Sequence, residues 1–532
     1  MNDPSEGRSA AGVAATVVPV PARDSPSTWV GVFTGLIATA LALAAGHLTA
    51  ALTTPAASPI LTVGQTFIDA TPEWLKSFAI RTFGSNDKLV LLAGIFTTLA
   101  IGSAVIGVLA LRRRWVGYAG LATLTAIGVA TAFTRPTASP VWVVPSLIAG
   151  AAGGVAYGLL SRNWRQKAHP REPETPDGFD RRRFLMSAAA LSAAAVASGG
   201  VTRYLNQRRA AEAGRSSLAI PAPASPARPL PAGAELNAPG IKPFFTPNAD
   251  FYRVDTALLT PMINIKDWKL TIHGMVDHPL TLDFAELVRR PLIERDITLN
   301  CVSNPVGGHY IGTARWIGAP LKAILDEAGV QPGATQIVSR SSDGMTIGTP
   351  AAIALDGRDA MLAIAMNGQP LPFEHGFPVR MLVPGLYGYE SATKWLVDLE
   401  LTTLQAFKAY WVKRGWVQQV PVKTSSKIDT PARGAAVAAG SVVVAGAAWA
   451  QDRGISKVEV QVDGGPWNPA TLGAQDTIDT WRQWEWTWQA AGGNHQLAVR
   501  ATDDTGTVQT AQNAPPFPSG STGWHTVDVV VN

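Results

Sequence analysis

The sequence is almost without cysteine, because Cys301 is the single one among 532 residues. A chain with one cysteine forms no intrachain disulfide, so an exported part of it must be stable through its hydrophobic core alone. The thiol of Cys301 is therefore free. Taken without its neighbours, a lone cysteine is more often a small buried side chain than a ligand.

The chain also lacks the ligand sets of common electron-transfer centres. No Cys-x-x-Cys-His occurs, and His47 is the only histidine within the long apolar stretches of the first 200 residues. A transmembrane b-type haem takes two axial imidazoles, and an iron–sulfur cluster takes several cysteines. We therefore expect neither a haem nor an iron–sulfur cluster in this chain.

Acidic residues are scarce in the first part of the chain. Residues 1–230 hold 21 Lys+Arg against 11 Asp+Glu (+10), whereas 231–532 hold 23 against 28 (−5), which sums to the +5 of the whole chain. The sequence pI of about 9.3 thus comes from the first part. We expect these cations to flank apolar segments, and we expect no nucleic-acid partner.

Long apolar runs without Asp, Glu, Lys or Arg dominate residues 28–205. A helix needs about 20 such residues to cross the ~30 Å hydrocarbon layer of a membrane. Five runs qualify as spans, the last one shorter and rich in alanine: Thr28–Leu52, Leu89–Leu111, Trp115–Thr134, Val141–Ser161 and Phe184–Thr202. Because transport paths usually carry buried charges, these runs favour an anchor over a transporter.

Basic residues sit asymmetrically between the spans. Arg112, Arg113 and Arg114 fill the second connection, and seven Lys or Arg residues lie between 162 and 183 in the fourth. The positive-inside rule places both connections in the cytoplasm. With five spans, residues 1–27 form a cytoplasmic tail and everything after Thr202 lies outside. We expect a multi-pass protein of the inner or plasma membrane.

The run Asp180-Arg181-Arg182-Arg183-Phe184-Leu185 precedes a weakly hydrophobic, alanine-rich stretch. It resembles a twin-arginine export signal, which carries proteins across a membrane already folded. The alternative interpretation is a basic flank that obeys the positive-inside rule. Both interpretations stay open on these residues.

Residues 206–240 are rich in proline and alanine, a composition that favours an extended, semi-rigid linker. After it, extended patterns at Trp268–Ile272, Asp296–Cys301 and Val379–Val383 alternate with short helices. One of these helices is amphipathic, covers Leu321–Ala328 and ends at Gly329. The pattern predicts a mixed α and β domain over 241–425.

Alternation in Asp296–Cys301 places Ile297, Leu299 and Cys301 on one face of a strand. The thiol then lies at the strand end, directly before the turn sequence Ser303-Asn304-Pro305-Val306-Gly307-Gly308. A thiolate is a soft donor that suits a redox metal, and a metal lowers the thiol pKa enough to remove the proton. Cys301 is therefore a candidate metal ligand.

Several motifs around Cys301 are similar to the sulfite oxidase-like molybdopterin family and follow in the family's order between Phe244 and Leu404. They are Thr298-Leu299-Asn300-Cys301-Val302-Ser303-Asn304, Gly312–Trp316 with Ala319-Pro320-Leu321, Met366–Pro372, His375–Arg380, Val383-Pro384-Gly385, Gly388 and Lys394-Trp395-Leu396. The resemblance implies a molybdenum cofactor whose metal is held by a pterin dithiolene, oxo groups and the Cys301 thiolate. It makes 241–425 a molybdopterin-binding oxidoreductase domain.

The resemblance also assigns cofactor-binding positions to Asn304, His375, Arg380 and Lys394. The pterin carries an anionic phosphate, which guanidinium and ammonium groups bind through charge-assisted hydrogen bonds. Each of these side chains, taken alone, has the alternative of an ordinary surface or salt-bridged residue. Their place within the matched motifs favours binding.

The reaction that the resemblance implies is a two-electron oxygen-atom transfer on a small substrate. An oxyanion such as sulfite calls for arginines in the substrate pocket, and we name Arg253 and Arg315 as candidate catalytic residues. The chain departs here from the sulfite oxidases proper. Where they have Arg-Asn-His and a second arginine soon after the cysteine, this sequence has Tyr252-Arg253-Val254-Asp255 and Asn304-Pro305-Val306. Substrate identity stays open.

Residues 426–532 alternate short strands with turns at Asp463-Gly464-Gly465 and Asp504-Thr505-Gly506. The expected strands are Ser441–Ala447, Ser456–Val462, Trp484–Trp488, Gln496–Ala501 and Val527–Val531. The pattern is typical of a β-sandwich. It resembles the family's immunoglobulin-like dimerisation domain, which implies a homodimer, and we expect Trp481, Trp484 and Trp486 in its core.

The predicted fold is thus an all-α transmembrane bundle over 28–205, then an α+β sulfite oxidase-type molybdopterin domain, then an all-β immunoglobulin-like sandwich. Electrons would pass to a separate acceptor, a membrane quinone or a cytochrome. Two alternatives stay open. One is the reverse chemistry, reduction of an S- or N-oxide as in the methionine sulfoxide reductases of this superfamily. The other is a non-catalytic, membrane-tethered interaction module.

Overall fold

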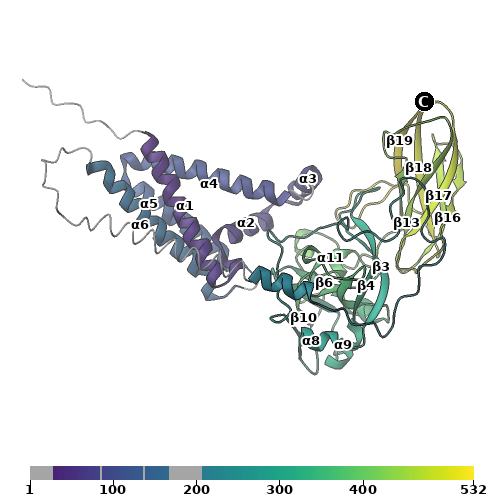
Figure 1. The fold of residues 1–532 in the computed structure, drawn as a ribbon, viewed down its shortest axis with the longest axis horizontal. Coiled ribbons are helices and arrows are strands. Elements are labelled where there is room, and N and C mark those ends of the chain that lie inside the picture. The colour runs from purple at the N-terminus through teal and green to yellow at the C-terminus, as the bar shows by residue number, and fades with distance from the viewer. Residues whose placement is uncertain (1–27, 84–86, 136–137, 167–206) are drawn as a thin grey trace, which may run out of the picture.

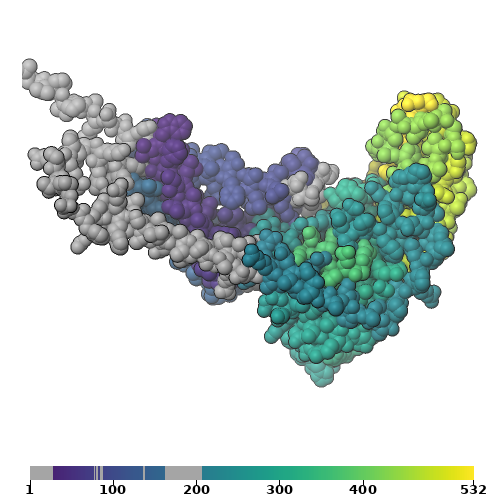
Figure 2. Space-filling view, in the orientation of Figure 1, coloured from purple at the N-terminus to yellow at the C-terminus, as the bar shows by residue number. Residues whose placement is uncertain are grey.

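The computed structural model describes residues 28–83, 87–135, 138–166 and 207–532. Three parts follow one another in chain order: a helical part, a mixed α/β domain and a β domain (Figure 1). In the space-filling view, the surface between the helical part and the β domain is hollowed (Figure 2). The expected fifth span Phe184–Thr202 and the arginines Arg181–Arg183 lie outside the described residues.

Four of the five predicted spans are confirmed as helices long and apolar enough to cross a membrane. They are α1 (Thr28–Leu52), α4 (Asp87–Arg112), α5 (Arg114–Phe133) and α6 (Val144–Gln166), the last preceded by the 3-10 turn η3 (Pro140–Val143). Helix α1 packs against α4 and α6. At Gly35, an added Cβ would lie 2.0 Å from the Ser103 backbone oxygen, so the α1–α4 crossing depends on a residue without a side chain.

Two short helices, α2 (Pro59–Ala70) and α3 (Glu73–Phe83), lie at the end of the helical part that faces the α/β domain (Figure 1). At the opposite end, the Tyr157 hydroxyl of α6 donates a hydrogen bond to the backbone oxygen of Arg114 at 3.1 Å. The arginines 112–114 and the α/β domain therefore lie at opposite ends of the long helices.

The α/β domain contains two sheets. In the first, β2 (Leu280–Asp283), β1 (Lys269–Gly274), β10 (Leu396–Thr402), β5 (Gln336–Ser341) and β6 (Thr346–Pro350) are neighbours in that order, with β1 and β10 parallel. The second is antiparallel and orders β3 (Ile293–Asn300), β4 (Ile311–Pro320), β7 (Met361–Met366) and β8 (Gln369–Pro370), with β9 (Arg380–Leu382) also paired to β7. The short helices are α8 (Phe284–Val288), α9 (Leu321–Ala328), α10 (Ala351–Leu355) and α11 (Gly388–Ser391), with the 3-10 turns η4 (Phe373–His375) and η5 (Val412–Arg414).

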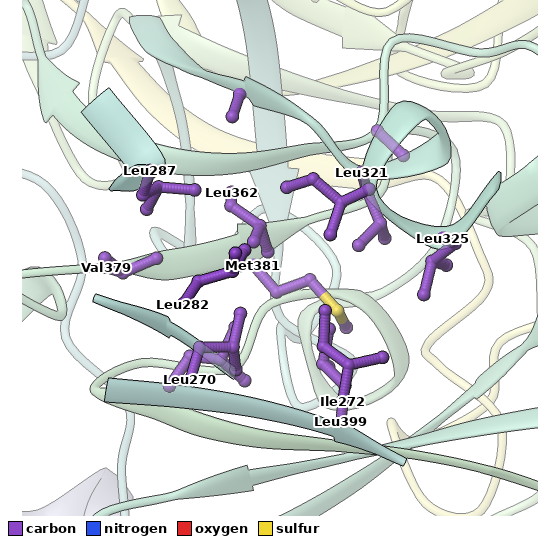
Figure 3. Close-up of a cluster of buried hydrophobic side chains, with 14 of the residues drawn as sticks. Leu270, Ile272, Leu282, Leu287, Leu321, Leu325, Leu362, Val379, Met381 and Leu399 are labelled. Atoms are coloured by element: carbon purple, nitrogen blue, oxygen red, sulfur yellow. The ribbon is translucent and has the colours of Figure 1, made fainter. Parts of the chain in front are cut away.

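A single apolar cluster joins these sheets and helices (Figure 3). Leu270 and Leu399 enter it from the first sheet, Leu362 and Met381 from the second, and Leu321 from α9. Helix α9 has the bounds that its amphipathic pattern predicts, and it ends because Gly329 adopts a left-handed φ of 68°. This core holds β9 through Met381, and a second buried cluster that contains Ile297 and Leu299 holds the end of β3. These two elements carry the site described below.

The β domain is a sandwich of two sheets, as predicted. One orders β11 (Ser425–Thr430), β13 (Gly440–Trp449), β17 (Arg482–Ala490) and β16 (Thr471–Leu472), and the other orders β12 (Ala436–Val437), β19 (His525–Val531), β18 (Gly493–Asp503), β14 (Ile455–Val462) and β15 (Trp467–Pro469). Trp484 and Trp488 are buried in its core, and Trp486 is half-buried against it. Trp481 differs from the expectation. It packs in the cluster between the two domains, where its indole N–H donates to the Phe244 oxygen at 3.0 Å.

The proline- and alanine-rich segment lies against the folded domains, although its composition is typical of a spacer. Residues 207–216 are helical, and the chain then runs extended along β3, where Glu294 donates its backbone N–H to the Ser225 oxygen at 2.9 Å. Further on, the backbone N–H of Leu236 donates to Oε1 of Gln483 in the β domain at 2.6 Å. Prolines leave few backbone donors, and the segment is held both by donors that remain, such as the Leu236 N–H, and by carbonyls such as that of Ser225.

Candidate active site

A cavity with about 760 Å³ of atom-free space, part of it open to solvent, lies in the α/β domain beside Cys301. Five stretches of chain line it, and most of them are distant in sequence. Its walls include Tyr252, Val254, Asp255 and Thr256; Cys301, Val302 and Ser303; Ser341, Asp343, Met345 and Ile347; Arg380, Gly388, Tyr389, Ala392, Thr393, Lys394 and Trp395; and Trp411 and Trp416.

Cys301 follows directly after β3, as its sequence pattern predicts, and its side chain lines the cavity. Its backbone N–H donates to the Tyr310 oxygen at 2.9 Å, and its own carbonyl accepts from the N–H of Asn304 at 3.0 Å. Burial raises the pKa of the Cys301 thiol, although hydrogen bonds from Ser303 and the charge of Lys394 act in the opposite direction. A bound metal ion would replace this proton.

Arg380 on β9 is a buried cation without a carboxylate partner among the described residues. Its guanidinium lies over the Trp316 ring at 5.4 Å and donates a long hydrogen bond of 3.4 Å to the His375 backbone oxygen. Burial lowers the pKa of Arg380 to about 10, and its Nε has no hydrogen-bond partner among the described residues. A buried, uncompensated charge at a cavity wall is costly unless an anion binds there.

Lys394 and Asp255 form a second charged group in the cavity wall. The Lys394 ammonium lies 2.7 Å from Asp255 and also donates to the Glu374 oxygen at 3.1 Å. Burial alone would raise the pKa of Asp255, but Lys394, Lys88 and Arg253 together hold it well below its usual range. Burial lowers the pKa of Lys394 to about 8, despite its ion pair with Asp255. Since Lys88 belongs to α4, this group connects the helical part directly to the cavity.

His375 lies behind the cavity wall. Its Nε2 donates to the Asn248 oxygen at 3.1 Å, and its ring packs edge-on against Phe251. Burial and the charges of Arg380 and Lys394 lower the pKa of His375 to about 4, so the imidazole is neutral near pH 7. Its contact with the site is through its carbonyl, which holds the Arg380 guanidinium.

Three further predicted site residues do not line the cavity among the described residues. Asn304 closes the loop after Cys301, because its Oδ1 accepts from the Tyr310 N–H at 2.9 Å. Arg253 pairs with Asp255 at 2.9 Å, one residue from the cavity wall. Arg315 pairs with Asp296 at 2.7 Å, on the strand neighbouring its own, so its guanidinium is held by a carboxylate outside the described cavity wall.

Sequence reasoning missed several wall residues. Tyr252 and Asp343 come from loops whose sequences carry no metal-binding or nucleophile pattern. Trp411 and Trp416 follow the last matched motif, and their spacing alone does not distinguish a cavity wall from a core. The Ser341-Ser342-Asp343-Gly344 turn between β5 and β6 was the available signal, since strand ends followed by turns place polar groups where ligands bind.

Comparison with known proteins matches residues 257–411 to the oxidoreductase molybdopterin binding domain family and residues 425–529 to the bacterial Ig domain family. The chain is 31% identical over 336 residues to sulfite oxidase of Gallus gallus, covering 53% of this chain and 72% of that protein. It is 30% identical over 342 residues to mitochondrial sulfite oxidase of Mus musculus, covering 54% of this chain and 62% of that protein. Among solved structures, the sulfane dehydrogenase SoxCD of Paracoccus pantotrophus matches with a TM-score of 0.48 and 24% identity over 54% of this chain and 81% of that one.

The chain belongs to the sulfite oxidase family of molybdopterin oxidoreductases. The resemblance drawn from the sequence motifs is thereby confirmed, and so is the assignment as a molybdopterin-dependent oxidoreductase. The chain spans 62% of the length of the mouse and human sulfite oxidases.

The residues of the cavity fit the cofactor that a sulfite oxidase-type domain implies. The Cys301 sulfur borders the cavity, and the uncompensated Arg380 cation and its orphan Nε provide a site for an anionic group. The described residues contain no group of three or more His, Cys, Asp or Glu side chains suited to a metal ion. A metal at Cys301 would accordingly take its other ligands from the dithiolene and oxo groups of the cofactor.

Proposed function

We propose that this chain is a membrane-anchored, extracytoplasmic molybdenum-cofactor oxidoreductase that transfers an oxygen atom on a small substrate and passes two electrons to a separate acceptor. The observation that carries the proposal is that one cavity has both the Cys301 sulfur and the Arg380 cation, which has no carboxylate partner among the described residues, in its wall. A soft ligand and an anion site in one place match a metal–pterin group with a phosphate.

Each residue of the chain has a distinct task in this proposal. Cys301 supplies the thiolate ligand, and Arg380 and Lys394 bind the anionic part of the pterin. His375 positions Arg380 through its carbonyl, and Asn304 holds the loop that presents Cys301. The cofactor supplies the two-electron chemistry when it is bound, and the protein supplies orientation and electrostatics.

A second candidate is reduction of a neutral S- or N-oxide, and the composition of the cavity wall favours it. Arg380 is the one arginine in the described wall, and Tyr252, Trp411 and Trp416 give much of the remainder an aromatic character. A sulfite site needs several cations, whereas a sulfoxide needs an apolar wall with few polar groups. The two directions are separated by assaying sulfite oxidation and methionine sulfoxide reduction side by side.

The placement of the domains supports an extracytoplasmic site in an inner or plasma membrane protein. Arg112–Arg114 lie at the end of the long helices opposite to the α/β domain, and the positive-inside rule assigns that end to the cytoplasm. Helix α6 ends at Gln166 near Arg114, whereas Gln207 lines a cavity beside Pro55 and Trp142 at the other end. Gln166 and Gln207 thus lie at opposite ends of the long helices, which supports the expectation of a fifth span.

Substitution of Cys301 tests the proposed metal ligand. We expect Cys301→Ala to abolish activity and to lower the molybdenum content, while some pterin stays bound through Arg380 and Lys394. Metal and pterin analysis of purified full-length protein, from cells able to make the cofactor, measures both quantities. Ile297→Val, at a buried side chain of β3 outside the described cavity wall, is the control for packing changes. A fully active Cys301→Ala variant, or wild-type protein without molybdenum, contradicts the proposal and favours the non-catalytic interaction module.

A further inference from the structure

A second cavity lies between the membrane anchor and the α/β domain, with about 1000 Å³ of atom-free space that is partly open. The anchor contributes Pro55, Leu61, Gln65, Arg135 and Trp142 to its wall, from the short helix α2 and from the turns at the ends of the long helices. The α/β domain contributes the loop that contains Leu258 and Leu259. The cavity is therefore mainly apolar, with a few polar groups, and it lies where the helices leave the expected membrane.

The two cavities share a wall. Asp343, in the turn between β5 and β6, lines both the cavity beside Cys301 and the cavity at the anchor. Its carboxyl accepts the backbone N–H of Met345 at 3.1 Å, which fixes it in the partition. The loop 252–262 also runs from one cavity to the other, with Tyr252 at the first and Leu258 at the second. A ligand in the anchor cavity would thus be one side-chain layer from the cofactor cavity.

Two polar groups of the anchor cavity have unused hydrogen-bond donors. No hydrogen bond joins the Gln65 side chain to another described residue, and the buried Nε of Arg135 has no partner among them. The other end of the Arg135 guanidinium is held at 2.6 Å by Asp69, which fixes its position. An apolar chamber with one guanidinium that an ion pair fixes and one amide donor fits a flat ring that bears carbonyl oxygens.

We propose that the anchor cavity binds the head group of a membrane quinone, which is the two-electron acceptor of this enzyme. This inference rests on the proposed function, whose electron acceptor it specifies. Gln65 and Arg135 donate to the quinone oxygens, and Leu61, Trp142 and Leu259 contact the ring and the first part of the isoprenoid tail. The opening toward the ends of the helices leads the tail into the lipid.

The electron count of such a reaction closes without a further reactant. Oxidation of one substrate molecule by oxygen-atom transfer takes the oxygen from water and releases two electrons and two protons. One quinone takes up two electrons and two protons and becomes the quinol. The sum is substrate, water and quinone giving oxidised substrate and quinol. Burial raises the pKa of Asp343, so a carboxyl able to hold a proton lies in the partition between the two cavities.

A quinone fits the cavity better than a soluble cytochrome does. A cytochrome would need an exposed docking surface near the cofactor cavity. On the side of the partition, the anchor already covers the α/β domain through contacts of Asp69 and Lys88. Both of these residues pair with groups of the α/β domain, Asp69 with Tyr410 and Lys88 with Asp255. The domain is therefore docked with this side toward the membrane, where a lipid-soluble acceptor has access.

Binding of decylubiquinone to the full-length protein in detergent micelles tests the proposal directly, by titration calorimetry. We expect Leu259→Trp to weaken binding at least tenfold, because Leu259 is 48% exposed in the cavity wall and the indole fills the space without disturbing a core. We expect Gln65→Leu to weaken it by about threefold to tenfold through loss of a hydrogen bond. The matched control is Val508→Trp, at a residue of the β domain that is 49% exposed and away from the cavity.

Turnover with sulfite as the probe substrate gives a second readout that separates the two proposals. The ratio of the decylubiquinone-linked rate to the ferricyanide-linked rate is expected to fall about tenfold in Leu259→Trp and to stay at the wild-type value in Val508→Trp. The quinone site is overturned by one result. Wild-type protein then contains molybdenum and reduces ferricyanide or a cytochrome, but it neither binds nor reduces the quinone. This result leaves the proposed function standing. Protein without molybdenum overturns the proposed function, and the calorimetric binding still decides the quinone site, also where sulfite is not turned over.

Discussion

Arg380 carries a positive charge at a place that is only 6% exposed and has no carboxylate partner among the described residues. Such a charge destabilises the fold while the cavity holds no anion, since an unpaired buried ion loses its hydration. This consequence follows from the burial of the charge alone. Arg380 therefore lowers the free energy of unfolding of the cofactor-free protein, and binding of the anionic cofactor offsets this loss.

Replacement of Arg380 by methionine is expected to act with opposite sign on stability and on cofactor binding. In the cofactor-free protein the variant should be more stable by about 1–4 kcal/mol, the range found when buried ions are replaced by apolar side chains. Cofactor affinity should fall roughly tenfold to hundredfold, through loss of hydrogen bonds to a charged group. Thermal unfolding of the cofactor-free protein and pterin content after gel filtration measure the two effects.

Arg340→Met is the matched control for that experiment. Arg340 also lies in the α/β domain, but it pairs with Asp398 and Glu400, and its side chain is 26% exposed. Its loss leaves two carboxylates without their partner, so stability should fall while pterin content stays unchanged. A variant of Arg380 that loses stability in the same way, with full cofactor content, would assign Arg380 a structural role.

Residue-level prediction from the sequence succeeded where a local pattern determines the position of a side chain. Cys301 lies at its strand end because alternation in β3 fixes which side chains share a face. Arg315 shows the limit. A pocket arginine and an arginine paired across a strand have the same local pattern, and the register of Asp296 opposite Arg315 appears only once β3 and β4 are aligned.

At the scale of elements, α11 is tied to the connection that leads into the β domain. Glu390 in α11 is 1% exposed and accepts hydrogen bonds from the backbone N–H groups of Gln419 and Val420. Burial raises the pKa of Glu390 to about 7, although these two hydrogen bonds act in the opposite direction. The folded chain therefore binds a proton at Glu390 more tightly than the unfolded chain does.

The sign of the resulting pH dependence follows from proton linkage. Between the usual glutamate value of 4.5 and about 7, the folded state holds more protons than the unfolded state, so stability falls as pH rises through this window. We expect wild type to lose about 2–3 kcal/mol relative to Glu390→Gln between these pH values. Unfolding in denaturant at several pH values measures the difference. Glu327→Gln, at a 48% exposed side chain, should show no such trend in this window.

Periodicity predicted α9 and the long strands β13, β14, β17, β18 and β19 with nearly their observed bounds, whereas short strands such as β2, β6 and β8 were not predicted. It did not predict where residues 207–240 lie. Composition indicates only that a segment forms no core of its own, and the contacts of Ser225 with β3 and of Leu236 with Gln483 depend on grooves formed by other elements. Trp481 is a similar case, because it directly precedes β17 and packs between the domains, whereas Trp484 within that strand lies in the sandwich core.

For the whole molecule, the contact between anchor and α/β domain centres on Asp69 at the end of α2. One carboxylate oxygen accepts from Arg135 of the anchor at 2.6 Å, and the other accepts from the Tyr410 hydroxyl at 2.8 Å. Arg414 adds a hydrogen bond to the Asp69 backbone oxygen at 3.0 Å, and its guanidinium lies 3.5 Å from the Tyr410 ring centroid. The carboxylate therefore joins the two parts of the chain at one point.

Asp69→Ala should loosen this contact without unfolding either part, since Asp69 lies outside both cores. Loss of hydrogen bonds to a charged group is expected to cost about 1.5–3 kcal/mol, so local opening at 408–414 and 59–70 should become roughly tenfold to hundredfold more frequent. Hydrogen–deuterium exchange of the full-length protein in micelles measures this, with Asp326→Ala, at an exposed helical ion pair with Lys322, as the control. Because the anchor cavity is formed jointly by the two parts, the same variant should weaken decylubiquinone binding, whereas pterin content should stay at the wild-type level. Unchanged exchange in both segments would mean that Lys88 and the apolar contacts alone hold the domain on its anchor.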